Sequence, residues 1–196
     1  MAKVYLGETA IAPVVESQVP ETKYGVSINN LLGTVDANGA YQIPTAPFTV
    51  DLSAIKSIPE SGLAYKWRDS RVVGLIKIGV EDLSASYALS YAFYGCTGLT
   101  SVDLSSLTTI NGGLAMSRAF EGCRGLTTMS FPALKEILSA ATQNQFNNMF
   151  VNCTNLTEIH FPSNMQERVE QLTGYSTQFG ATNATIYFDL PSTADA

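Results

Sequence analysis

A repeat of 26 to 30 residues runs through most of this chain and constrains its fold more than any other feature. Residues 93–104, 120–131 and 150–161 all follow the pattern F-x-[GN]-C-x-[GN]-L-T-x-φ-x-φ, where φ is apolar. Residues 67–78 follow its aromatic, small and apolar positions, with Trp67 and Ser70 in place of Phe and Cys. The φ-x-φ elements start at 50, 76, 102, 129, 159 and 186, with spacings of 26, 26, 27, 30 and 27 residues. This period predicts a solenoid whose coils pack only against their neighbours.

Each position of the repeat predicts a particular local structure. The φ-x-φ element predicts a short strand whose alternate residues face the core, paired in parallel with the strands of adjacent coils. Strands are expected at about 50–52, 76–78, 102–104, 129–131, 159–161 and 186–188. An apolar residue also lies four positions before each aromatic residue, as a helical turn on the outer side of each coil requires. These pairs are Leu63 and Trp67, Leu89 and Phe93, Met116 and Phe120, and Phe146 and Phe150. The predicted fold class is therefore an α/β solenoid.

The two ends of the chain differ from the repeat. Residues 1–45 predict a β-rich segment with a hairpin turn at 36–39, and this segment either caps the first coil or docks on another chain. Its length favours docking. Residues 46–196 form the solenoid, with a C-terminal cap at about 163–190. In this cap Ser163 and Gln166 have the spacing of a helix capping box, and Gly174 fits the helix C-terminus.

Four small residues occupy one equivalent position in successive repeats and are expected to stack as a ladder: Ser70, Cys96, Cys123 and Cys153. Three cysteines cannot form a self-contained disulfide framework. We interpret them as buried, reduced thiols, because the preceding repeat has a serine at the same position. A disulfide between adjacent coils is the alternative. A metal site is not expected, because the single histidine, His160, lies in another part of its repeat.

Charge and hydropathy exclude several classes of partner. The net charge is −6 and only 11 residues are Lys or Arg, so nucleic-acid binding is not expected. No run of apolar residues approaches the ~20 that span a bilayer, so membrane insertion is not expected. The N-terminal residues also lack the apolar stretch of a signal peptide, which predicts a chain that does not use the general secretory route.

The functional residues that the sequence predicts form a surface rather than a catalytic centre. Asp51 and Asp103 are middle residues of strands two coils apart, which is unsuitable for a pair of glycosidase carboxylates, and we expect neither catalysis nor a cofactor. The outward residues of the strand face are the expected binding face, with a merely solvated face as the alternative: Asp51, Lys77, Asp103, Ser130, His160 and Tyr187. The tyrosines at 87, 91 and 94 either stack on sugars or simply pack their rings.

The string A-F-x-x-C-x-x-L-T-x-φ-x-φ-P, found at residues 119–132, resembles the BspA-like leucine-rich-repeat family. The resemblance covers about residues 46–190, and the repeats here are longer than those usual in that family. This long form, as in residues 87–108, resembles proteins of phages that infect gut bacteria. Residues 1–9 are similar to the starts of phage tail, fibre and head-decoration proteins, although this match is short.

The resemblance implies a non-catalytic function. It favours a phage virion structural protein, such as a head-fibre, decoration or tail-associated subunit, that is assembled in the host cytoplasm. The implied partners are other virion proteins, contacted through the N-terminal segment, and a host-surface protein or glycan. A homo-oligomer is expected from the symmetry of virion attachments. The alternative is a bacterial cell-surface adhesin of the same repeat type.

Overall fold

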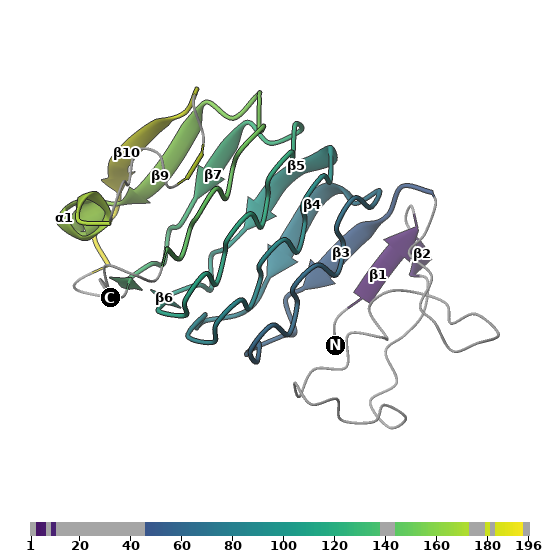
Figure 1. Cartoon of the computed structure of the whole chain (residues 1–196), viewed down its shortest axis with the longest axis horizontal. Helices are drawn as coiled ribbons and strands as arrows, with labels where there is room; N and C mark the ends of the chain where they lie inside the picture. Colours follow the sequence, from purple (N-terminus) through teal and green to yellow (C-terminus); the bar gives the residue numbers. More distant parts are fainter. Residues whose placement is uncertain are drawn as a thin grey trace.

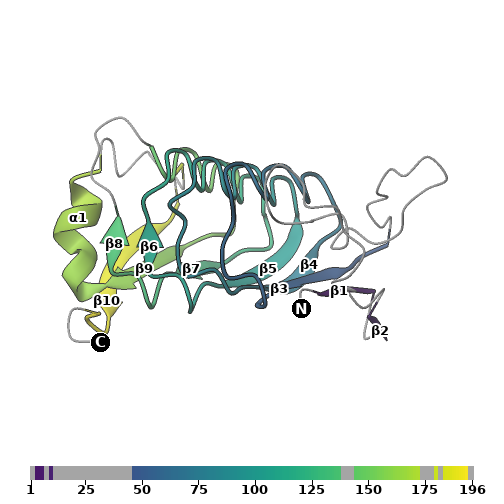
Figure 2. The same ribbon diagram turned by 90° about the horizontal axis from the view of Figure 1, so that it is seen from below.

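The chain winds into a solenoid whose coils stack along one axis, as the computed structural model shows (Figure 1). The structure describes residues 3–6, 9–10, 46–137, 144–172, 179–180 and 183–193. One strand of each coil lies on a strand face that runs along the molecule, opposite a stack of turns (Figure 2). These strands are β3 (Thr49–Leu52), β4 (Val73–Ile78), β5 (Gly98–Asp103), β7 (Thr128–Ser130), β9 (Glu158–Pro162) and β10 (Thr185–Leu190). The parallel-strand solenoid and its six strand positions are thereby confirmed.

The strands pair in the register that the repeat dictates. β3, β4 and β5 are parallel neighbours, and β7, β9 and β10 form a second parallel group. The pairing of β4 with β5 contains one register shift, which lies after Gly74 and before Leu75. Equivalent residues of adjacent repeats therefore lie side by side.

The N-terminal strands lie against the first coil. β1 (Lys3–Leu6) pairs antiparallel with both β2 (Thr9–Ala10) and β3. This pairing is the position that a capping segment would take. The hairpin turn expected at 36–39 lies outside the described residues, as does the rest of 11–45.

A second set of backbone pairs connects the coils on another side of the solenoid. Ser57 bridges to Asp82, and Asp82 bridges to Thr109, all in parallel. The next step is the pairing of β6 (Thr109–Ile110) with β8 (Glu136–Ile137). The first coils are thus bonded at two strand positions before they reach the turns, whereas β5 and β7 belong to different sheets and their coils are joined by the β6–β8 pair.

The outer side of each coil is a series of turns, so the expected short helices are wrong. In the first coil Ala64, Lys66, Arg68 and Ser70 each donate a backbone hydrogen bond to the carbonyl three residues earlier. The residues between them, Leu63, Tyr65, Trp67 and Asp69, donate instead to carbonyls of the second coil. An α-helix would direct its amides along its own axis. Here every second amide bonds to the adjacent coil, so the turns form a hydrogen-bonded wall.

A left-handed backbone conformation at every fourth residue produces these turns. Positive φ angles occur at residues 61, 65 and 69, at 87, 91 and 95, at 114, 118 and 122, and at 144, 148 and 152. Such a residue interrupts a right-handed helix. The four-residue apolar spacing survives because one turn also spans four residues. The predicted inward pairs are all fully buried, as in Leu89 with Phe93 and Met116 with Phe120.

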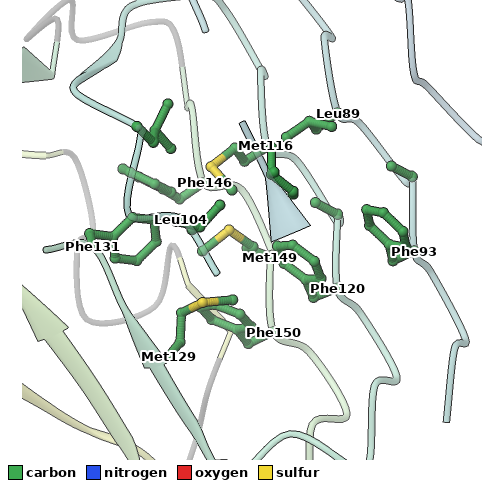
Figure 3. Close-up of a cluster of buried hydrophobic side chains, with 14 of the residues drawn as sticks. Leu89, Phe93, Leu104, Met116, Phe120, Met129, Phe131, Phe146, Met149 and Phe150 are labelled. Carbon is green, nitrogen blue, oxygen red and sulfur yellow. The ribbon is translucent and has the colours of Figure 1, made fainter. Parts of the chain in front are cut away.

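The core consists of columns of equivalent side chains from successive coils. Trp67, Phe93, Phe120 and Phe150 form one column, whose neighbouring ring centroids lie 5.0, 5.6 and 6.1 Å apart with nearly parallel planes. Figure 3 shows three of these rings in sequence, with methionines and leucines filling the space beside them. Rings stacked at this separation are favourable beyond the area they bury. The repeat therefore specifies the packing as well as the strands.

The C-terminal cap contains a helix, but not the predicted capping box. A 3-10 turn (Ser163–Met165) leads into the short helix α1 (Gln166–Glu170), whose Val169 is buried. Ser163 lies inside the 3-10 turn, and neither helix start has a side-chain capping hydrogen bond. The capping-box prediction is wrong because the chain enters the helix directly from β9. Gly174 lies outside the described residues.

Candidate binding surfaces

The structure places the predicted strand-face residues in two in-register rows. Asp51, Lys77 and Asp103 align across β3, β4 and β5. Ser130, His160 and Tyr187 align across β7, β9 and β10. All six are at least partly exposed, and the residues beside them in the strands face the core.

The two aspartates of the first row have a local structural role. Asp51 accepts a hydrogen bond from the backbone N–H of Ser53, and Asp103 accepts one from Ser105, both at 2.9 Å. Hydrogen bonds from Ser105 lower the pKa of Asp103. Each carboxylate thus closes the turn that follows its strand. The Lys77 side chain lies between them in the register, which gives the row alternating charge.

The second row contains a charged cluster around His160. Its Nδ1 lies 2.8 Å from Oδ1 of Asp189, and its Nε2 lies 3.3 Å from Oε2 of Glu158. The ring of Tyr187 stacks on the imidazole at a centroid distance of 5.0 Å. Burial alone would lower the pKa of His160, but the hydrogen bonds and charges of Asp189 and Glu158 outweigh it and raise the pKa. Protonated His160 donates to both carboxylates, because only the imidazolium donates from both nitrogens, and its bond to Asp189 links β9 to β10.

We expect the stability of the β9–β10 contact to depend on pH through His160. Its folded pKa is raised, so its stabilising contribution is fully present below the unfolded pKa of about 6.5 and is lost as pH rises through the folded pKa. Urea denaturation across this range should show the midpoint falling with increasing pH. The His160→Gln variant should lack this component. Because the chain has one histidine, its NMR signal reports the titration directly, and a pKa below that of the unfolded chain would contradict the assignment.

The cysteine ladder lies in the core. Cys96, Cys123 and Cys153 are free and buried, one in each of three successive coils. Each thiol donates to a carbonyl of the preceding coil, at Trp67, Phe93 and Phe120, with distances of 3.0, 3.1 and 3.0 Å. Ser70 lies 3.6 Å from the Cys96 sulfur at the equivalent position of the first coil. Burial raises the pKa of Cys96 to about 11 and that of Cys153 to about 12, and it also raises the pKa of Cys123.

These thiols should be inert in the folded protein. At neutral pH all three are protonated and shielded, whereas the thiolate is the reactive form. We expect a thiol reagent such as Ellman's reagent to label none of them rapidly without denaturant and all three in urea. One fast-reacting thiol in the native protein, or a disulfide found by non-reducing mass spectrometry, would contradict the arrangement.

Sequence reasoning only partly identified the surface on the turn side. This side carries four tyrosines and two arginines from the first three coils, which we call the turn-face cluster: Tyr65, Arg68, Tyr87, Tyr91, Tyr94 and Arg118. Ring and guanidinium contacts join all of them except Tyr87. Tyr65 and Tyr91 stack at a centroid distance of 4.7 Å with a 12° interplanar angle. The Arg68 guanidinium lies 4.7 Å from the Tyr94 ring centroid. Tyr65 could have been found by counting back one repeat of 26 residues from Tyr91.

The backbone under the turn-face cluster is strained. Tyr65, Tyr87, Tyr91 and Arg118 have φ angles of 62°, 57°, 56° and 51°. Residues other than glycine and asparagine rarely adopt this conformation, which costs about 1–2 kcal/mol per residue. In the fourth coil the three equivalent positions are all asparagine, at 144, 148 and 152. The same backbone thus holds well-suited residues in one coil and bulky ones in others.

No cluster of three or more metal-ligating side chains occurs within the described part of the chain. The same residues contain no helix long and apolar enough to cross a membrane.

These features define a parallel-strand solenoid with two candidate binding surfaces, the strand face and the turn-face cluster. Residues 84–175, just under half of the chain, match the family model described as the BspA type leucine-rich repeat region (6 copies). This match supports a place for the repeats in the BspA-like leucine-rich-repeat family, whose members are typically binding scaffolds. No curated protein and no solved structure matches the chain.

Proposed function

We propose that this protein is a non-catalytic scaffold for protein binding or adhesion. One observation carries the proposal: tyrosines occupy left-handed positions of the turn face where asparagine or glycine would be less strained. Strain of this kind, held on an exposed surface, indicates that the side chains are retained for contacts outside the fold. The repeat family supports the same function.

Tyr87 is the residue at which the backbone strain and the contacts of the ring can be separated best. Its side chain is 43% exposed, and among the described residues no ring stacks on it. Replacing Tyr87 with asparagine should raise the free energy of unfolding by up to about 1 kcal/mol, because asparagine tolerates the left-handed conformation. Urea denaturation measures this change. A loss of more than about 1 kcal/mol would instead show that the ring packs for stability.

Binding by the whole protein provides the direct test of function. Fluorescently labelled full-length protein should bind saturably to intact bacterial or mammalian cells in flow cytometry. The Tyr65→Asn/Tyr87→Asn variant should bind more weakly, and the Lys77→Ala and Tyr187→Ala variants test the other candidate surface, the strand face. If the strand-face variants alone lose binding, the predicted strand face is the functional surface. The proposal fails if no cell type binds the protein saturably.

For the setting of this surface we propose a virion, in which residues 1–45 dock on other virion proteins and the subunit is a homo-oligomer. The only support for this setting is the resemblance of residues 1–9 and 87–108 to phage proteins. A bacterial cell surface is the alternative, and the repeat match agrees with it equally well. Immunodetection in gradient-purified particles and in cell-envelope fractions separates the two. Light scattering of the purified protein reports the oligomer.

A further inference from the structure

We infer that the turn-face cluster is a carbohydrate-binding site for neutral pyranose chains. This inference rests on the proposed binding function and assigns a ligand class to one surface. Tyr91 stacks against one face of Tyr65, and the Tyr94 ring lies 5.8 Å from the Tyr91 ring at an angle of 33°. The rings therefore brace each other and present a preorganised aromatic surface, which limits the loss of side-chain entropy on binding.

Two of the tyrosines offer open ring surface. Tyr65 is 53% exposed and Tyr87 is 43% exposed, the largest exposures among big apolar side chains in the described turns. An aromatic ring has an apolar face and, in tyrosine, a polar tip. The C–H face of a pyranose ring is likewise apolar, and its rim of hydroxyls is polar. Exposed rings on adjacent coils suit an oligosaccharide rather than a single sugar.

The charged groups around the rings indicate a neutral ligand. Arg68 Nε lies 3.2 Å from Oδ2 of Asp69, and Arg118 Nη1 lies 2.8 Å from Oε2 of Glu121. Each guanidinium therefore has a carboxylate partner, which leaves donors and acceptors adjacent to the rings without a net positive charge. Neighbouring sugar hydroxyls both donate and accept, so they match such pairs.

An anionic ligand fits this surface poorly. A phosphate or a nucleic-acid backbone would need unpaired cations, whereas both arginines are paired and the exposed carboxylate of Asp69 would repel it. The chain as a whole carries a net charge of −6. A protein partner would use the same tyrosines, since tyrosine and arginine are common at interfaces. The exposed large apolar side chains of these turns are tyrosines alone, however, and a protein interface of normal size also needs a broad apolar centre.

The test uses an array of immobilised neutral, sialylated and sulfated oligosaccharides, probed with the full-length protein. We expect binding to one or more neutral glycans. Binding should fall at least about tenfold in the Tyr65→Asn/Tyr87→Asn variant, as for loss of an aromatic anchor. The Gln171→Ala control changes an exposed residue at the end of helix α1, outside both candidate surfaces, and should bind normally. Urea denaturation of the double variant verifies folding, which asparagine should preserve at these positions.

Other results of the glycan array and the cell-binding assay would contradict the inference, the proposed function or both. Binding only to acidic glycans, or binding that the double variant retains, overturns the inference. If no glycan binds while the protein still binds cells in a Tyr65- and Tyr87-dependent manner, the ligand is a protein, so the inference fails and the proposed function stands. If neither cells nor glycans bind, both are wrong.

Discussion

Replacing Phe120 with alanine should lower the free energy of unfolding by about 3–5 kcal/mol, the usual cost of emptying a buried aromatic site. Phe120 is fully buried and stacks between Phe93 and Phe150, at 5.6 and 6.1 Å. Its carbonyl oxygen also accepts a hydrogen bond from the thiol of Cys153. Because each coil contacts only its neighbours, a cavity here weakens two coil–coil interfaces at once.

Urea denaturation followed by circular dichroism measures this effect. Tyr187→Ala is the matched control, since it truncates an aromatic side chain that is 39% exposed and outside the core. We expect the control to lose about 1 kcal/mol or less. A loss for Phe120→Ala as small as that of the control would mean that the ring column contributes little.

Gly79→Ala should destabilise the first coil through a backbone clash. A Cβ on Gly79 would lie 2.0 Å from the carbonyl oxygen and 2.6 Å from the carbonyl carbon of Ser53. The amide of Gly79 also donates to Leu52, at 3.1 Å. No side-chain rotation relieves contact between two backbones, so the coils must separate locally. We expect a loss at or above the upper end of the ~1–3 kcal/mol typical of overpacking.

Gly74→Ala separates this steric effect from backbone strain. Gly74 has a φ of +75°, but the nearest atom to its added Cβ is Cγ2 of Thr49 at 3.9 Å. This variant should lose only the ~1–2 kcal/mol that a left-handed alanine costs. Thermal unfolding ranks the two variants, and hydrogen exchange should show Gly79→Ala opening the first coil. A larger loss for Gly74→Ala would contradict close coil contact at Gly79.

The strands were predictable from sequence because the repeat places apolar residues at fixed spacing in every coil. The outer turns were not, since a four-residue apolar spacing, as in Leu89 and Phe93, fits both a helical turn and a chain of four-residue turns. The asparagines at 144, 148 and 152 carried the missing signal. Residues that tolerate positive φ at every fourth position indicate turns rather than a helix.

The candidate surfaces were only partly predictable from the sequence. Strand-face residues follow from alternation along a strand, so Asp51, Lys77 and Asp103 could be aligned in advance. Glu158 follows from the same alternation, two residues before His160 in β9. The second carboxylate, Asp189, could not be predicted, because it lies in the cap rather than in a repeat of the F-x-x-C pattern. The stacking of Tyr65 on Tyr91 depends on the left-handed backbone, which the expected helix would not have provided.

The alternating hydrogen bonds of the turn wall have a mechanical consequence. Leu63, Tyr65, Trp67 and Asp69 donate to the adjacent coil on one side of the solenoid, and the strand pairs bond on the other sides. A force that pulls the two ends apart along the axis loads all sides of one coil boundary together. A coil can then detach only when its bonds on every side break within one short displacement. A solenoid bonded on several sides of each coil should therefore resist an axial pulling force, such as that of fluid flow on an attached protein, better than a repeat protein whose coils are bonded along one side only.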